Sequence, residues 1–190
     1  MAAAAELFRR NGYTGTGLKQ IVMQANAPFG SLYHFFPGGK EQLGEQVIRT
    51  SGMAYIQLFD LFITPAPDLI SGIETSFAAA AVTLEETGYA DACPIATVAL
   101  EVASTNETLR KATADVFAAW IAAGAEAFGR FGLPEEAARR LTIAVVTSLE
   151  GAFVLSRALR NTEPLAVAGA AAVAAARAEL QSAGLNPRTS

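Results

Sequence analysis

Apolar residues recur at helical spacing along this chain, and no stretch alternates between apolar and polar as a half-buried strand does. After Pro134, for example, they return at Leu141, Val145, Leu149 and Phe153, which places them on one side of a helix. Alanine, the best helix former, is far above its usual share, and runs of β-branched residues are scarce. The pattern therefore predicts an all-α fold.

Glycine and proline residues divide the chain into about nine predicted helices. The expected ranges are 2–11, 18–25, 28–35, 39–62, 67–87, 94–103, 106–130, 134–160 and 164–183. We place a domain boundary after residue 48. It separates a small first domain, residues 1–48, from a larger helical bundle, residues 49–190.

The composition excludes several classes of protein. Hydrophobic residues make up 52% of the chain and charged residues only 17%, the opposite of the balance in a disordered chain. The single cysteine, Cys93, and the single histidine, His34, argue against an internal disulfide, a metal site and a His-based catalytic site. We therefore expect neither a metal nor a cofactor.

The lack of a signal peptide and of a run of about twenty apolar residues predicts a cytoplasmic protein without a membrane span.

The charge is divided unevenly between the two predicted domains. The net charge is −4; residues 1–50 hold five basic and three acidic side chains (+2), so the remainder carries −6. A slightly basic first domain on an acidic body indicates a nucleic-acid-binding part attached to a part with another role.

Two short predicted helices with a tight turn between them lie within the first 36 residues. The first of the pair starts at Leu18, the turn spans residues 25–27, and Pro28 fits the first turn of the next helix, where its missing N–H costs nothing. This is a helix-turn-helix arrangement, whose second helix enters the major groove of DNA.

These residues also carry a family resemblance. The segment from Gly12 to Leu43 reads GYTGTGLKQIVMQANAPFGSLYHFFPGGKEQL and resembles the DNA-binding module of TetR-family transcriptional regulators. The extra glycine before Lys40, together with CPIATVALE from Cys93 to Glu101, is similar to the LmrA/YxaF-like branch of that family. The resemblance implies a homodimeric repressor that binds a palindromic operator and is released by a small hydrophobic or aromatic effector.

The motif and the helix-turn-helix geometry nominate residues for DNA contact. The start of the third helix is expected to reach base edges, and hydroxyl, imidazole and ammonium groups nearby to contact phosphates. The predicted DNA-binding residues are Thr16, Lys19, Pro28, Phe29, Gly30, Ser31, Tyr33, His34 and Lys40. We expect Leu32, Phe35 and Phe36 mainly to pack in the interior.

Two features depart from the usual family pattern. Phe29 stands where members often carry lysine, and phenylalanine can touch a thymine methyl group but cannot read guanine. Members also usually carry a further, often basic, segment ahead of the first helix, whereas this chain starts at Met1. A start placed downstream of the true one and a genuine lack of a basic arm both stay open.

The larger domain is expected to bind the effector and to form the dimer. Large apolar side chains among many small ones, with a few polar anchors, are typical of a ligand pocket. The predicted pocket residues are Phe59, Phe62, Phe77, Thr97, Val98, Glu101, Phe117, Trp120, Ile121, Leu149, Glu150 and Phe153. The predicted dimer-interface residues, on the last two helices, are Leu141, Val145, Ala152, Leu165, Val173 and Leu180.

Two other classes of function stay in view. The first is a small-molecule binding or sequestering protein whose head has weak or lost DNA binding, which Phe29 and the missing arm would favour. The second is an all-α enzyme. The absence of a Ser–His or paired-carboxylate motif argues against an enzyme.

Overall fold

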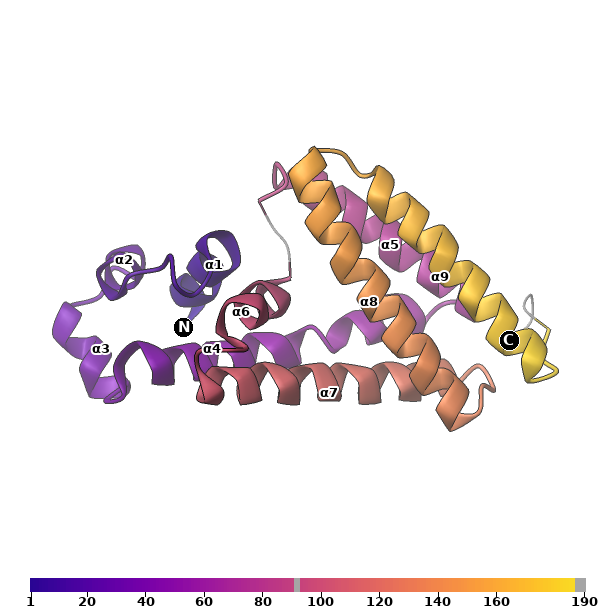
Figure 1. The fold of residues 1–190 in the computed structure, drawn as a ribbon, viewed down its shortest axis with the longest axis horizontal. Helices are drawn as coiled ribbons and strands as arrows, with labels where there is room; N and C mark the ends of the chain where they lie inside the picture. Colours follow the sequence, from indigo (N-terminus) through magenta and orange to yellow (C-terminus); the bar gives the residue numbers. More distant parts are fainter. Residues whose placement is uncertain (91–92, 187–190) are drawn as a thin grey trace. The chain divides into compact units, whose positions relative to one another are not determined.

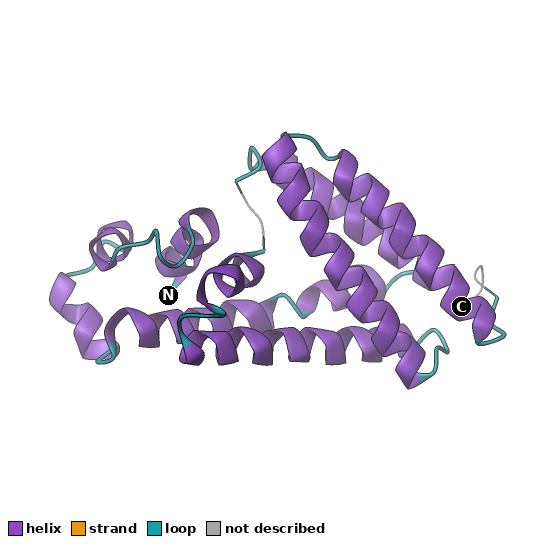
Figure 2. Ribbon diagram, viewed as in Figure 1, coloured by secondary structure: helices purple, strands orange, loops and turns teal. Residues whose placement is uncertain are grey.

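The computed structural model describes residues 1–90 and 93–186, and every regular element in these ranges is helical (Figure 2). The elements, labelled in Figure 1 apart from η1, are α1 (Ala2–Asn11), α2 (Leu18–Gln24), α3 (Phe29–Phe35), α4 (Gly39–Ala54), the π-helical η1 (Phe59–Ile63), α5 (Leu69–Glu86), α6 (Pro94–Val102), α7 (Glu107–Gly129), α8 (Glu135–Leu159) and α9 (Glu163–Ser182). The all-α prediction is confirmed. Eight of the nine predicted helices match these bounds to within two residues at each end.

The exception is the helix predicted over residues 39–62. It ends at Ala54, and after a turn at residues 55 and 56 the chain is helical again from Gln57 and continues into the π-helical η1. Gly52 packs against Ile95 and Val116, whereas Phe59 meets the ring of Phe128 at 6.3 Å between centroids. The two ends of the predicted helix are thus buried against different sets of residues, and packing overrides helix propensity between them.

The chain divides into two compact units. The head unit comprises Met1–Tyr55 and Ala92–Ala118, and the bundle unit comprises Ile56–Asp91 and Ala119–Ser190. This division differs from the boundary expected after residue 48, because α6 and the first half of α7 pack on the head rather than with the later helices. The sequence gives no sign of this grouping, since the two parts of the head unit lie far apart along the chain.

The head unit is built around the side chains that its first four helices turn inward. Leu7 and Phe8 of α1, Ile21 and Val22 of α2 and Leu32 of α3 are buried. Three short helices cannot bury much apolar surface alone. The longer α4 therefore adds a row at helical spacing, formed by Leu43, Val47 and Ile48.

In the bundle unit, α9 packs along both α5 and α8 (Figure 1). Local signals fix where these helices begin and end. The carboxylate of Asp68 accepts a hydrogen bond from the Ser71 amide at 2.7 Å and caps the start of α5. Arg160 takes a left-handed conformation (φ 55°) that ends α8.

One described helix, α8, is long and apolar enough by length and composition to cross a bilayer. The core helix of a folded domain passes the same test. Within the bundle unit, α8 places Leu141, Val145 and Ala152 in a core shared with α5 and α9. The length of α8 is therefore weak grounds for a membrane span.

Candidate DNA-binding site

The turn between α2 and α3 sets the direction of the second helix. Asn26 has φ 49°, a left-handed conformation that asparagine tolerates better than most residues. The Ala27 amide then donates to the carbonyl of Val22 at 2.9 Å, and Pro28, in extended conformation, precedes the first residue of α3. The two helices with this turn form the expected helix-turn-helix.

The outer face of α3 carries two aromatic rings. Phe29 is 44% exposed and Tyr33, one turn later, is 49% exposed, and their rings meet edge to face at 5.9 Å. Leu32, on the inner face, is buried. Both rings are therefore accessible to a partner, and their contact with DNA stays a prediction.

Gly30 follows Phe29 in the first turn of α3 and has open space around it. A side-chain carbon built at this position meets no atom of the protein within 4 Å. Packing within the chain therefore gives no reason for glycine here. The hydroxyl of Ser31 donates to the Pro28 carbonyl at 2.6 Å, which supports the first turn of α3 and leaves the hydroxyl oxygen free to accept.

The predicted cation Lys40 is engaged inside the head unit. Its ammonium lies 4.4 Å from the centroid of the Tyr13 ring, a cation–π contact. Partial burial lowers the pKa of Lys40, and the negative charge of Glu101 opposes that shift. Burial also raises the pKa of the Tyr13 hydroxyl, and the carboxylate of Glu41 adds to this. A DNA phosphate would compete for Lys40 with these neighbours.

Lys19 and His34 are exposed, as a phosphate contact requires. The ring of Phe35 meets the imidazole of His34 edge-on at 5.1 Å and is itself 68% exposed. The expectation that Phe35 packs in the interior is wrong, because Leu32 is the residue that α3 buries in the head unit. Sequence spacing alone did not distinguish the two residues.

Thr16 corrects the set of predicted phosphate contacts. Its side chain is fully buried, and the carbonyls of Gly12 at 2.7 Å and Leu7 at 3.2 Å share its one hydroxyl proton. Leu7 belongs to α1 and Gly12 directly follows it, so Thr16 supplies a donor at the C-terminal end of this helix. The side chain offers nothing to DNA.

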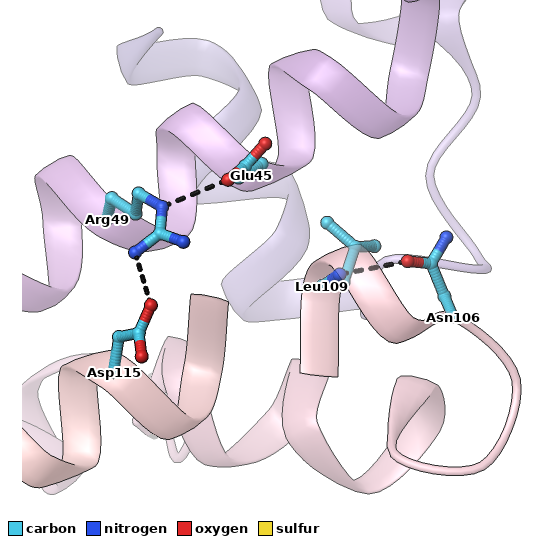
Figure 3. A network of polar contacts seen from close by, with 5 residues as sticks. All are labelled: Glu45, Arg49, Asn106, Leu109 and Asp115. Atoms are coloured by element: carbon cyan, nitrogen blue, oxygen red, sulfur yellow. Dashed lines mark hydrogen bonds and ion pairs between the residues drawn. The ribbon is translucent and has the colours of Figure 1, made fainter. Parts of the chain in front are cut away.

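Within the head unit, three polar contacts tie side chains of residues 101–115 to α4 and to the turn between α1 and α2. Asn106 donates to Glu41 of α4 at 2.6 Å. Arg49 of α4 bridges Glu45 at 3.1 Å and Asp115 of α7 at 2.9 Å (Figure 3).

The third contact is made by Glu101, whose carboxylate accepts the amides of Tyr13 and Thr14. Sequence reasoning assigned Glu101 to the effector pocket. The structure places its carboxylate on the turn between α1 and α2.

Comparison with known proteins agrees with this geometry. Residues 1–47 match the family model described as bacterial regulatory proteins, tetR family, and residues 70–171 match the C-terminal domain of LmrA/YxaF-like transcriptional regulators. The chain belongs to the TetR family. The resemblance seen in the sequence, including the LmrA/YxaF-like branch, is thereby confirmed.

Relatives in this family are similar over most of their length. The HTH-type transcriptional regulator YxaF of Bacillus subtilis is 33% identical over 162 residues, 85% of either chain. LmrA of the same organism, also an HTH-type transcriptional regulator, is 31% identical over 165 residues, covering 87% of this chain and 88% of LmrA. A solved structure, the regulatory protein TetR from Rhodobacter sphaeroides, shares the fold with a TM-score of 0.79 at 21% identity, covering 92% of this chain and 95% of that one.

The effector pocket predicted for this TetR-family chain draws on both units. Thr97, Val98, Glu101 and Phe117 belong to the head unit, and the other eight predicted residues to the bundle unit. Within the head unit, Val98 is buried and the Thr97 hydroxyl donates to the Cys93 carbonyl at 2.9 Å.

Within the bundle unit, Phe77 is buried and packs against Gly169, whereas most of the others are half-buried. The half-buried members are Phe59, Phe62, Ile121, Leu149, Glu150 and Phe153, and Trp120 is 6% exposed. The pocket stays a prediction.

The residues predicted for the dimer interface lie in the interior of the bundle unit. Leu141, Val145, Ala152, Leu165, Val173 and Leu180 are each at most 8% exposed and belong to the core of the bundle unit. The prediction is wrong for these residues, because the apolar stripe found from helical spacing is the side that α8 and α9 turn toward α5 and toward each other.

A second apolar set on these two helices is exposed instead: Ile143, Val154, Leu155, Leu159 and Val167. A shallow depression of about 500 Å³ between α8 and α9 is lined mainly by small side chains, with Arg140 and Glu179 paired beside it at 3.0 Å.

Proposed function

We propose that this TetR-family regulator binds a palindromic operator as a homodimer, represses the adjoining genes and is released by a small hydrophobic or aromatic effector. The exposed start of α3 carries the proposal. Phe29 and Tyr33 are 44% and 49% exposed, and Gly30 has open space around it, on the helix that reaches base edges in helix-turn-helix proteins.

The phosphate contacts can be tested by removing one cation. Lys19 is exposed on α2, and Lys111, equally exposed on α7, serves as the matched control. Lys19→Ala should weaken binding to all DNA sequences alike and reduce the slope of log affinity against log salt concentration by about 1. Lys111→Ala should leave both unchanged. Equal effects of the two substitutions would show that binding depends on total charge and not on this face of the head.

The exposed apolar set on α8 and α9 supports the homodimer. Ile143 and Val154 lie eleven residues apart, about three helical turns, and so share one side of α8, opposite the buried stripe. Val167 is likewise exposed on α9, where alanines leave the helix surface flat. An apolar surface of this kind is rarely left to water, and a two-fold dimer would bury it against its own copy.

A charge placed on this face tests the dimer. Val154 is 57% exposed on α8, and Val82, 54% exposed on α5, is the matched control. Val154→Glu should convert the dimer to a monomer in sedimentation equilibrium without lowering the helix content. Val82→Glu should leave the dimer intact. A wild-type chain that sediments as a monomer at all concentrations would refute the homodimer.

Release of the DNA by an effector requires that effector binding and operator binding weaken each other. Half-buried aromatic and aliphatic side chains in the bundle unit, among them Phe59, Phe62 and Phe153, support an apolar ligand. A coupling of about 1–3 kcal/mol would weaken operator binding by about 5- to 150-fold, and DNA would weaken effector binding by the same factor. Trp120, the only tryptophan in the sequence, offers a fluorescence signal for the binding titration. A compound that binds this chain without changing its DNA affinity would not be the effector.

A further inference from the structure

The turn between α1 and α2 is held by a side chain from a distant part of the sequence. Glu101, on α6, accepts a hydrogen bond from the Tyr13 amide at 3.1 Å through Oε1 and from the Thr14 amide at 2.7 Å through Oε2. The partners are 88 and 87 residues apart along the chain. Hydrogen bonds from amides to a carboxylate are shorter and stronger than those between neutral groups.

Gly12 leaves the space that this carboxylate occupies. Its φ of 74° lies in the left-handed region, which disfavours any residue with a side chain. A side-chain carbon at position 12 would also overlap the carboxylate of Glu101. The backbone of the turn and the carboxylate thus fit each other, and neither could keep its place if position 12 carried a side chain.

The position of Glu101 is fixed by its own helix. Val98 and Val102, which flank it on α6, are buried in the head unit, where α6 packs on α1 and α4. The carboxylate is therefore carried by a packed helix and not by a free loop. Any displacement of α6 along α1 would stretch or break both hydrogen bonds.

The held turn leads directly into the DNA-facing part of the head. Tyr13 carries the Lys40 ammonium above its ring, and Gly17, at the end of the turn, is the residue that precedes α2. The Glu101 carboxylate also acts on Lys40 through its charge. Moving the turn would therefore move both the start of α2 and a predicted phosphate contact.

We propose that Glu101 is a positioning residue, which holds the α1–α2 turn from α6 and thereby fixes the head in the geometry that binds DNA. The inference rests on the proposed DNA binding. It assigns Glu101 a role other than anchoring an effector, and it makes α6 a segment whose place determines how well the head binds its operator.

The test compares Glu101→Gln and Glu101→Ala with the wild-type chain and with Glu107→Gln. Glu107 is an exposed carboxylate of α7 that pairs only locally with Arg110 among its described contacts, so it controls for loss of one negative charge. Affinity for labelled DNA flanking its own gene is measured by fluorescence anisotropy at a temperature where circular dichroism shows every variant to be folded. Glutamine keeps one acceptor oxygen, so we expect an affinity loss of about tenfold for Glu101→Gln, a larger loss for Glu101→Ala and none for the control.

Amide exchange supplies a readout that loss of global stability would not mimic. In the Glu101 variants, the Tyr13 and Thr14 amides should lose protection and shift in the NMR spectrum, while the amides of the α3 core keep theirs. Wild-type binding combined with unchanged binding by both Glu101 variants would overturn the inference and leave the proposed function standing. Absence of operator binding by the wild-type chain would remove the proposed function, and this role with it.

Discussion

A substitution at Gly30 should affect the stability of the protein and its binding to DNA in opposite directions. Because a methyl group there meets nothing within 4 Å, Gly30→Ala introduces no clash in the free protein. Alanine is favoured over glycine inside a helix by about 0.5–1 kcal/mol, and Gly30 is the second residue of α3, so we take the lower value. For a chain of this size, about 0.5 kcal/mol raises the melting temperature by about 1–2 °C.

The same substitution should weaken operator binding. If base edges approach Gly30 closely, the added methyl group must displace α3 or the DNA, and we expect an affinity loss of about tenfold, which corresponds to about 1.4 kcal/mol. Differential scanning calorimetry and fluorescence anisotropy on the same preparation measure the two effects. Gly129→Ala is the control, since that helical glycine is equally unobstructed and lies in the bundle unit.

Each outcome has a clear meaning. Greater stability with weaker DNA binding would support a close approach of DNA at Gly30. Unchanged DNA binding by Gly30→Ala would refute the argument that an external partner requires glycine there. A loss of stability would show that the open space around Gly30 is absent in solution.

Three further substitutions test the structural account. Asp68→Ala removes the cap on the Ser71 amide and should destabilise the protein by about 1 kcal/mol in urea unfolding. Leu141→Ala opens the bundle core and should cost about 2–5 kcal/mol, while sedimentation still shows a dimer; a monomer with unchanged stability would restore Leu141 to the interface. Thr16→Val should cost about 1–2 kcal/mol of unfolding free energy, because the buried hydroxyl proton shared by the Gly12 and Leu7 carbonyls is lost. It should leave the salt dependence of DNA binding unaltered; a shallower slope would make Thr16 a phosphate contact after all.

Helix bounds could be predicted from this sequence because their causes are local. Pro94 and Pro164 fall in the first turn of α6 and α9, and Gly12 and Gly184 lie just beyond the ends of α1 and α9 with positive φ. These residues act through their own backbone conformation, whatever the rest of the chain does. The interruption of the helix predicted over residues 39–62 has no such local signal, because it arises where the chain passes from one packed unit to the other.

The sequence does not say which part of the protein each side of a helix packs against. Roles of side chains that depend on this neighbour could therefore not be predicted. Helical spacing found the stripe through Leu141 and Val145, but spacing does not say whether a stripe faces its own chain or a second copy. Thr16 is predicted to contact phosphate, and its burial follows from how α1 ends. Glu101 could not be assigned to the head, because 87 residues separate it from the nearer amide it binds.

The central claim, that this chain binds a specific DNA site through its head, is tested most directly by one titration. DNA flanking its own gene and a scrambled fragment of equal length are labelled and titrated with wild-type protein across a series of salt concentrations. The account predicts nanomolar affinity for the flanking DNA, an affinity at least about a thousandfold weaker for the scrambled fragment, and a steep loss of binding with salt. Equal and weak binding to both fragments, with a flat salt dependence, would contradict it and favour a protein that binds small molecules without an operator.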